Sequence, residues 1–316
     1  MSRLLKTGGR RCRRPVVRWR HRRPVGQHRR RSLAKVLAPT VWAGLSLDRP
    51  RIMGVLNVTP DSFSDGGARA AAEQAVVAGM AMVQDGADIV DVGGESTRPG
   101  AATVPPDIEQ QRVVPVIRTL AENGVLVSVD TRNASTMVAA LRAGAKIVND
   151  VSGLRHDPAA AGVIAASQCP VVLMHMRGTP ATMRDRSLYD DVVADVVAEL
   201  RARLAVAMRA GICADAIMLD PGIGFAKDAD QSATILRALD RFAVLGHPLL
   251  VGVSRKSFIG SLANEPDARQ RLPGSLAAAL FALSRGAAVV RVHDVAETRQ
   301  AIAVWSALTG VCTQAP

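Results

Sequence analysis

From residue 51 onward, short apolar segments rich in β-branched residues alternate with longer segments whose apolar positions follow a helical period. This alternation predicts repeated strand–helix units. The strand segments are mostly apolar throughout, which is typical of a parallel sheet covered by helices. The predicted strands are residues 52–58, 88–93, 125–130, 146–151, 170–176, 216–220, 248–254 and 289–294.

Eight units of this kind favour an α/β fold of the (β/α)8 TIM barrel type, because repeated right-handed crossovers over about 260 residues close into a barrel. A doubly wound open sheet is the alternative that the pattern leaves open. The barrel would occupy residues 51–316 as one domain, and the 48% of apolar residues is enough to fill its core.

Nearly every predicted strand ends in a side chain that can bind or ionise. In a barrel of this type the carboxyl ends of the strands form one rim, so these positions would become a single polar ring. Capping of a local turn would explain any one of them, but it explains the whole set poorly. The positions are Asn57, Asp91, Asp130, Asn149, Asp150, His175, Asp220, Ser254, Arg255, Arg291 and His293.

The net charge of +12 is distributed very unevenly along the chain. Residues 1–50 carry +14, whereas residues 51–316 carry −2. We expect residues 1–50 to form a disordered, Arg-rich N-terminal extension, because like charges repel and little apolar surface is available to bury. The extension could be a transit peptide, a nucleic-acid-binding tail or the product of an upstream start codon, and nucleic-acid binding is not expected of the barrel itself.

Targeting and redox signals are weak. No apolar segment is long enough for a secretory signal or a membrane span. The four cysteines are scattered without C-x-x-C spacing, which argues against a zinc site or a disulfide framework. A cytoplasmic protein fits these observations best.

Four loop segments are unusually rich in Gly, Pro and small polar residues, as expected of loops that close over an anionic ligand. With three strand-end motifs, SVDTR (128–132), IVNDVSG (147–153) and RVHD (291–294), they resemble the signature set of the dihydropteroate synthases, a pterin-binding TIM-barrel family. The resemblance covers residues 51–305 in the family's order. The loops are NVTPDSFSDGG (57–67), GGESTRPG (93–100), DPGIGFAKD (220–228) and SRKSFIG (254–260).

The resemblance implies an enzyme of folate biosynthesis. Such an enzyme condenses a dihydropterin-CH₂-diphosphate with 4-aminobenzoate, releases diphosphate and forms dihydropteroate. It also implies Mg²⁺ as cofactor and a homodimer. The family's route is dissociative, so diphosphate leaves before the arylamine attacks, and no covalent nucleophile is needed. In agreement, the sequence offers no Ser-His-Asp or Cys-His arrangement.

A pterin ring presents N–H donors beside a carbonyl acceptor, so its site needs carboxylate or amide oxygens on one side and a donor on the other. The matching family positions hold the ring, with Asp220 and Asn149 at its amino edge and Lys256 at its oxo edge. The full set implied for the pterin is Asp130, Asn149, Met174, Asp220, Lys256 and Arg291.

Departure of diphosphate needs positive charge and oriented donors. Arg291 and His293 alternate along the last strand, so we expect both to face the anion. Asn57 matches the family residue near the metal and the diphosphate, which suits Mg²⁺ because this ion keeps several waters and needs few protein ligands. The residues implied for diphosphate are Asn57, Thr97, Arg98, Arg291 and His293.

The aminobenzoate pocket is implied at Phe63, Arg98, Pro99 and Ser257. The residues implied to act in catalysis are Asp61, Asp130, Lys256 and Arg291. We interpret Glu95, Asp150, His156 and Asp157 as groups that cap local turns. His175 could take part in the site or cap a local turn.

Two other classes of protein remain as alternatives: a methyltetrahydrofolate-binding methyltransferase and a non-catalytic pterin-binding paralogue. The first would not need the loops at 57–67 and 254–260. In the family, an insertion of two residues after G-x-G-F accompanies insensitivity to sulfonamides. The segment GIGFAKDADQ has no such insertion, so we predict ordinary sensitivity.

Overall fold

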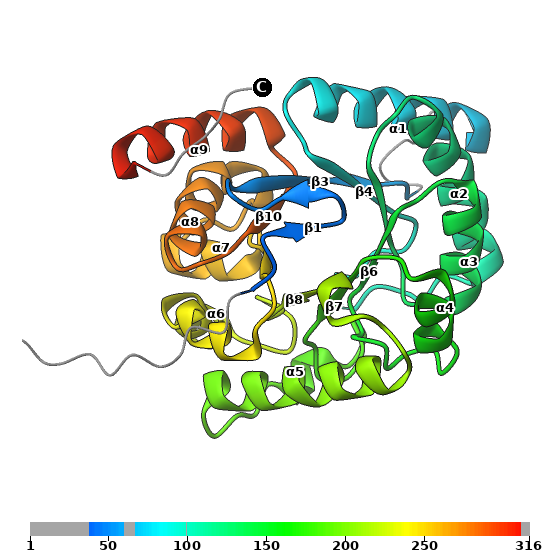
Figure 1. Cartoon of the computed structure of the whole chain (residues 1–316). Helices are drawn as coiled ribbons and strands as arrows, with labels where there is room; N and C mark the ends of the chain where they lie inside the picture. The colour runs from blue at the N-terminus through cyan, green and yellow to red at the C-terminus, as the bar shows by residue number, and fades with distance from the viewer. Residues whose placement is uncertain (1–37, 60–66, 99, 311–316) are drawn as a thin grey trace, which may run out of the picture. The chain divides into compact units, whose positions relative to one another are not determined.

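Eight parallel strands form a barrel with helices around its outside, as predicted (Figure 1). The computed structural model describes residues 38–59, 67–98 and 100–310, all within the compact unit Lys35–Pro316. The barrel strands are β3 (Arg51–Asn57), β4 (Ile89–Gly93), β5 (Val127–Asp130), β6 (Ile147–Asp150), β7 (Val171–Met174), β8 (Ile217–Asp220), β9 (Leu250–Gly252) and β10 (Val289–Val292).

Each strand is followed by helix, and two α-helices follow β9. The α-helices are α1 (Gly67–Gln84), α2 (Pro106–Glu122), α3 (Ala134–Ala143), α4 (Ala160–Ser167), α5 (Val192–Arg209), α6 (Ala229–Arg237), α7 (Ser257–Ala263), α8 (Leu272–Ser284) and α9 (Val295–Thr309). Short 3₁₀ turns lie at η2 (Met183–Arg186), η3 (Ala214–Ala216), η4 (Leu239–Leu245) and η5 (Ala268–Gln270). Within the described ranges, no helix is long and apolar enough to span a bilayer.

The sheet closes on itself. Its hydrogen-bonded order is β8-β7-β6-β5-β4-β3-β10-β9, and a parallel bridge between Leu219 and Leu249 joins the two ends. The backbone N–H of Leu219 donates to the carbonyl of Pro248 at 3.0 Å across this seam. Strand residues are buried on both faces, because side chains fill the barrel and helices cover its outside. The closed order excludes the open-sheet alternative.

Sequence-local capping explains where two of the helices begin. The carboxylate of Asp191 accepts hydrogen bonds from the N–H groups of Val193 and Ala194 at the start of α5. Asp228 and Gln231 form a reciprocal capping box at the start of α6. The second cap matters for the site, because it ends the loop that follows β8.

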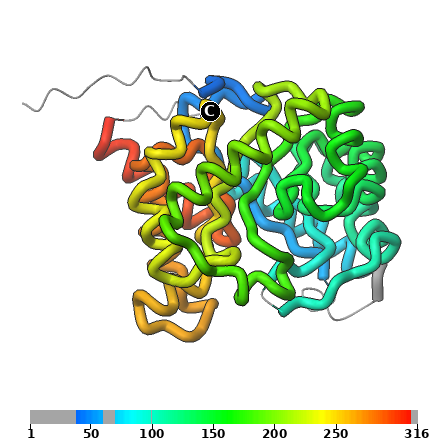
Figure 2. The backbone as a smooth tube through the Cα atoms, turned by 90° about the horizontal axis from the view of Figure 1, so that it is seen from below, coloured from blue at the N-terminus to red at the C-terminus, as the bar shows by residue number. Residues whose placement is uncertain are grey.

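A short hairpin closes the amino-terminal end of the barrel. Strands β1 (Val41–Trp42) and β2 (Leu45–Ser46) pair antiparallel, and the indole of Trp42 is buried among the first residues of the barrel strands. Its Nε1–H donates to the carbonyl of Ala216 at 2.9 Å. Figure 2 shows the hairpin at this end of the barrel. Trp42 therefore plugs the barrel at the end opposite to the strand carboxyl termini.

The hairpin corrects the expectation that residues 1–50 form a disordered extension. Between residues 38 and 50 only Asp48 and Arg49 are charged, and Trp42 supplies apolar surface to bury. Arg49 also donates to Asp88 at the start of the barrel, with Nη2 and Oδ1 2.6 Å apart. The charge summed over residues 1–50 does not show that residues 38–50 carry only these two opposite charges. Residues 1–37, which hold most of the positive charge, lie outside the described residues.

Candidate active site

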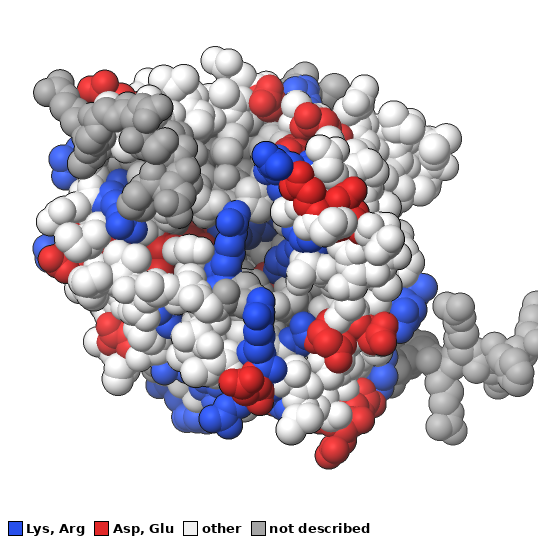
Figure 3. Space-filling model, turned by 180° about the vertical axis from the view of Figure 1, so that it is seen from behind, with Lys and Arg blue, Asp and Glu red and all other residues white. Residues whose placement is uncertain are grey.

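The carboxyl ends of the strands bring polar side chains into one layer. Asn57 is in register with Gly93, and Gly93 is in register with Asp130. Asp130 is in turn level with Asn149 on the next strand. Figure 3 looks onto this end of the barrel, where Lys and Arg side chains gather around a central hollow. Dispersed sequence positions thus form a single rim.

The guanidinium of Arg291 lies between two buried carboxylates. Its Nε donates to Oδ2 of Asp91 at 2.6 Å, and its Nη2 donates to Oδ2 of Asp130 at 2.7 Å. Burial opposes the positive charge, but Asp91 and Asp130 outweigh it and raise the pKa of Arg291 above its ordinary value. The side chain is therefore a permanent cation with a fixed orientation.

Asp91 also sets the orientation of the Asn149 amide. The Nδ2 of Asn149 donates to Oδ2 of Asp91 at 2.9 Å. This contact assigns the amide so that its Oδ1 is left to accept a hydrogen bond. The sequence marks Asp91 as a polar strand residue but gives no reason to assign it a particular role in the site. The structure makes it the group that connects Arg291 with Asn149.

Two buried carboxylate oxygens in this layer have no hydrogen-bond partner among the described residues, namely Oδ1 of Asp91 and Oδ1 of Asp130. An unpaired buried acceptor costs free energy, so it marks a place where a ligand donor fits. Burial raises the pKa of Asp130 to about 7, against the opposing effect of Arg291. Asp130 therefore changes charge close to neutral pH.

Asp220, at the end of β8, is held by the turn that follows it. Its Oδ1 accepts the N–H of Gly222 at 2.7 Å, which leaves Oδ2 without a hydrogen bond to the described residues. Gly222 has φ of +68°, and a Cβ there would lie 1.9 Å from the carbonyl oxygen of His175. Only glycine fits this turn. Burial raises the pKa of Asp220, while the charge of Lys256 opposes the shift.

Lys256 reaches the same turn from the loop after β9. Its Nζ donates to the carbonyl of Ile223 and lies 4.6 Å from the centre of the Phe225 ring. Gly252, on β9, lies close to this ammonium, since a Cβ there would be in ordinary contact with the Nζ at 3.8 Å. Burial lowers the pKa of Lys256 to about 8, with Asp220 acting in the opposite direction. The rim thus places an ammonium close to the Asp220 carboxylate.

Met174, at the end of β7, lies in a small apolar cluster of Val151, Met174, Met176, Met183 and Ala226, with Phe225 packed against it. This cluster lies beside the turn after β8, because a Cβ built on Gly222 would be 3.4 Å from the Cγ of Met174. The structure therefore places an apolar floor next to Asp220 and Lys256.

His293 lies just beyond β10 and contacts Ser254 rather than an acid. The Oγ of Ser254 is 3.0 Å from Nδ1 of His293 and accepts the backbone N–H of the same residue at 3.2 Å. Ser254 can then donate to Nδ1, which puts the ring proton on Nε2. Burial and the neighbouring Arg291 lower the pKa of His293 to about 4. His293 is therefore a neutral donor at physiological pH.

The remaining predicted residues are spread over the surrounding loops. Asn57 is half-buried at the end of β3, Thr97 is half-buried after β4, and Arg98 is exposed. Ser257 is exposed at the first position of α7. Asp61, Phe63 and Pro99 lie outside the described residues.

A buried ion pair between Glu95 and Arg132 anchors the loop that follows β4. Glu95 accepts from Arg132 through two hydrogen bonds of 2.9 and 3.0 Å, and it also accepts the N–H of Val104. Asp150 accepts the N–H groups of Ser152 and Leu154 in its own turn. The interpretation of Glu95 and Asp150 as supporting groups agrees with these contacts.

A further polar chain, Lys227–His175–Glu199, was not predicted. From the sequence, His175 is a strand-end residue that could serve the site or cap a turn, and Lys227 is only part of a loop motif. Glu199 lies in the middle of α5 and carries no local signal, because only the packing of α5 against the barrel brings it to His175.

The rim of acids, amide and ammonium lies at the carboxyl ends of the strands, where TIM-barrel enzymes have their active sites. Residues 53–293 match the family of pterin binding enzymes. The chain is 46% identical over 279 residues to the dihydropteroate synthase of Neisseria meningitidis serogroup C, covering 86% of this chain and 99% of that protein. The chain therefore belongs to the dihydropteroate synthase family, enzymes of folate biosynthesis.

Solved structures agree with this membership. A Xanthomonas albilineans dihydropteroate synthase with 4-aminobenzoic acid matches with a TM-score of 0.80 and 47% identity, over 87% of this chain and 97% of that one. A Yersinia pestis dihydropteroate synthase with a sulfonamide drug matches with a TM-score of 0.79 and 42% identity, over 84% of this chain and 96% of that one.

Proposed function

We propose that the rim around Asp130, Asn149, Asp220 and Lys256 binds the dihydropterin diphosphate and condenses it with 4-aminobenzoate. The observation that carries the proposal is the set of acceptors without partners on this rim. Oδ1 of Asp130 is buried and unpaired, and neither Oδ1 of Asn149 nor Oδ2 of Asp220 accepts from a described residue. A pterin offers several N–H donors on one edge, and these complete the set.

The ammonium of Lys256 supplies the complementary donor for the pterin carbonyl. Among the described residues it donates one hydrogen bond, to the carbonyl of Ile223, so further N–H groups remain for a ligand. Met174 supports one face of the ring from the apolar cluster described above. Arg291 lies across the other side of the proposed site, where a planar guanidinium can stack on a ring.

The diphosphate group is proposed to bind Asn57, Thr97, Arg98, Arg291 and His293. The Nη1 of Arg291 makes no hydrogen bond to a described residue, which leaves it for the anion. His293 contributes a neutral Nε2–H donor rather than a charge. The loop after β4 that carries Thr97 and Arg98 is held in place by the Glu95–Arg132 pair.

Mg²⁺ is proposed to bind beside Asn57. The described residues contain no cluster of three or more His, Cys, Asp or Glu side chains suited to a metal. The single side-chain oxygen of Asn57 nevertheless fits Mg²⁺, because this ion is held by one or two protein oxygens together with substrate phosphates and water. When bound, the ion would offset negative charge on the leaving diphosphate.

In the proposed reaction, the bond between the pterin methylene carbon and the diphosphate oxygen breaks, and the amine nitrogen of 4-aminobenzoate attacks that carbon and then loses a proton. The carboxylate of Asp130 stabilises positive charge that develops on the pterin, and Arg291 stabilises the departing anion. Asp61 is proposed to assist from the loop after β3. Phe63, Arg98, Pro99 and Ser257 are proposed to form the aminobenzoate pocket.

The direct test incubates purified protein with the dihydropterin diphosphate, Mg²⁺ and labelled 4-aminobenzoate. We expect labelled dihydropteroate and equimolar diphosphate. Tight pterin binding without labelled product would overturn the enzymatic proposal in favour of a pterin-binding paralogue. Lys256→Ala should weaken pterin binding, and an unchanged affinity would remove Lys256 from the site.

We further propose a cytoplasmic homodimer. Exposed apolar side chains at Leu262, Phe281, Val304 and Leu308 lie on the outer helices α7, α8 and α9, where a second copy could cover them. The free thiols of Cys169 and Cys213 suit a reducing compartment. Sedimentation of the wild type and of Leu308→Asp tests the dimer, since a monomeric wild type would exclude it.

A further inference from the structure

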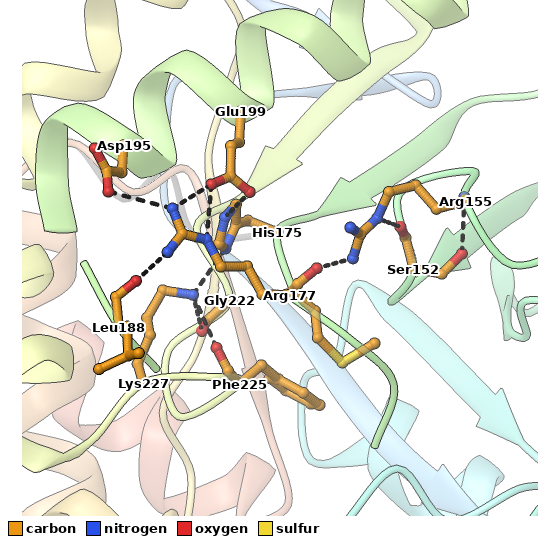
Figure 4. A network of polar contacts seen from close by, with 11 residues as sticks. Ser152, Arg155, His175, Arg177, Leu188, Asp195, Glu199, Gly222, Phe225 and Lys227 are labelled. Atoms are coloured by element: carbon orange, nitrogen blue, oxygen red, sulfur yellow. Dashed lines mark hydrogen bonds and ion pairs between the residues drawn. The ribbon is translucent and has the colours of Figure 1, made fainter. Parts of the chain in front are cut away.

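A buried chain of polar groups lies behind the turn that follows β8 (Figure 4). The Nζ of Lys227 is 2.9 Å from Nδ1 of His175, and Nε2 of His175 is 3.1 Å from Oε2 of Glu199. Lys227 is only 7% exposed, and His175 only 3%. Such burial is unusual for a lysine unless each of its donors is used.

The hydrogen bonds assign the proton positions in this chain. Lys227 has three donors, and its neighbours are the carbonyls of Gly222 and Phe225 at 3.0 and 2.9 Å and the Nδ1 of His175. Nδ1 is therefore the acceptor, and Nε2–H donates to Glu199. Burial lowers the pKa of His175 to about 4, so the ring is neutral. The imidazole thus bridges a carboxylate and the Lys227 amino group, whose pKa burial lowers to about 7 against the opposing charge of Asp220.

The acidic end of the chain is fixed in turn by Arg177. Its guanidinium donates to Glu199 through Nε and Nη2 and to Asp195 at 3.2 Å. It also lies 3.9 Å from the centre of the Tyr189 ring. The hydrogen bond from His175, followed by those from Arg177, lowers the pKa of Glu199 to about 2. Glu199 is therefore an ionised anchor on α5.

The other end of the chain holds the turn against which Lys256 is placed. Lys227 binds the carbonyls of Gly222 and Phe225, while Lys256 binds the carbonyl of Ile223 between them. The ring of Phe225 also lies against the Lys256 ammonium. Two lysines thus hold three carbonyls of one short turn: Lys227 binds the outer two, and Lys256 binds the one between them.

We propose that Lys227 is a positioning residue for the pterin site: tethered to Glu199 through His175, it fixes the Gly222–Phe225 turn and thereby the position of Lys256. The inference rests on the proposed role of Lys256 in binding the pterin. If Lys227 were purely structural, its removal would change pterin affinity equally with or without Lys256. If it positions Lys256, its removal changes the affinity only when Lys256 is present.

The test is a double-mutant cycle with Lys227→Met, Lys256→Met and the double variant. Methionine keeps the unbranched chain but removes the charge and all three donors. The measurement is the dissociation constant of the dihydropterin diphosphate by calorimetry, without 4-aminobenzoate. Lys146→Met, at an exposed lysine between α3 and β6, is the matched control and should bind with wild-type affinity.

We expect Lys227→Met to weaken pterin binding about 10- to 100-fold, the cost of a small misplacement of a binding group. In the Lys256→Met background the same change should have little further effect. An equal loss in both backgrounds, or wild-type affinity of a folded Lys227→Met protein, would overturn the positioning role. Wild-type affinity of Lys256→Met would instead overturn the proposed role of Lys256.

If Lys227→Met does not fold, Glu199→Gln replaces it in the cycle. Glu199 is only partly buried, and glutamine keeps an acceptor for His175 while removing the charge. A loss of pterin affinity that disappears in the Lys256→Met background supports the proposal. A loss that persists there, or no loss, contradicts it.

Discussion

Arg291 donates to Asp130 across the mouth of the barrel at 2.7 Å, although the two residues are 161 positions apart in the sequence. The contact joins β10 to β5 over the two intervening strands β3 and β4. It gives Arg291 a fixed orientation and leaves Asp130 with a second oxygen that has no partner among the described residues. The unpaired oxygen of Asp130 therefore costs free energy in the free protein, and the proposed pterin donor would remove that cost.

We predict that Asp130→Asn stabilises the free protein in a pH-dependent way. Because the folded pKa of Asp130 is raised to about 7 from 3.8, its contribution to stability is present at low pH and is lost as the pH rises toward and through 7. Asparagine mimics the protonated acid. The thermal midpoint should therefore exceed that of the wild type at pH 8 and match it only at about pH 3, below the ordinary carboxyl pKa of 3.8.

The control for this prediction is Asp240→Asn, because Asp240 is an exposed acid on η4. Its thermal midpoint should follow the wild type at both pH values. Asp130→Asn should also lose turnover, since the neutral amide cannot stabilise positive charge on the pterin. A variant that is less stable than the wild type at pH 8 would show that Asp130 is not strained in the free protein.

We predict that His293→Gln keeps most of the affinity for diphosphate, whereas His293→Ala loses it about tenfold, which corresponds to one hydrogen bond to a charged group. Glutamine places an N–H donor where Nε2 of the neutral ring lies. Since the pKa of His293 is lowered to about 4, the wild type and His293→Gln should share one pH dependence of binding between pH 6 and 8. Calorimetric titration with diphosphate measures both; binding that strengthens toward acid only in the wild type would indicate a charged imidazole.

The eight strands and their polar ends could be predicted from the sequence, because each strand is defined by its own residues and the barrel dictates where the ends meet. Asn149 and Asp220 were found in this way. Asp91 was not assigned to the site, because its role depends on Arg291, 200 positions away. Glu199 gave no signal, since helical residues carry no mark of the strand they will face. The role of Trp42 was not predicted, because the high positive charge of the preceding residues indicated disorder for the whole segment 1–50.

We predict that sulfonamides inhibit the enzyme in competition with 4-aminobenzoate. The loop after β8 runs directly from the Gly222–Phe225 turn into the capping box at Asp228, with no additional residues that could narrow the pocket. Initial rates measured against 4-aminobenzoate concentration should approach the same maximal rate at every sulfonamide concentration, while the apparent KM for 4-aminobenzoate rises with the drug. Inhibition that raised 4-aminobenzoate does not relieve would place the drug elsewhere.

The last prediction separates the amino-terminal residues from the barrel. Deleting residues 1–37 should leave turnover and unfolding free energy unchanged, whereas deleting residues 1–50 also removes the Trp42 plug. Trp42→Ala alone should lower the unfolding free energy by about 3–5 kcal/mol, because a fully buried indole leaves a cavity. Val41→Ala, at its exposed neighbour, should change it by less than about 0.5 kcal/mol. Urea unfolding measures these differences. Lost turnover after deletion of residues 1–37 would show that this segment takes part in the reaction, whereas an unchanged stability of Trp42→Ala would mean that the hairpin does not hold the barrel closed.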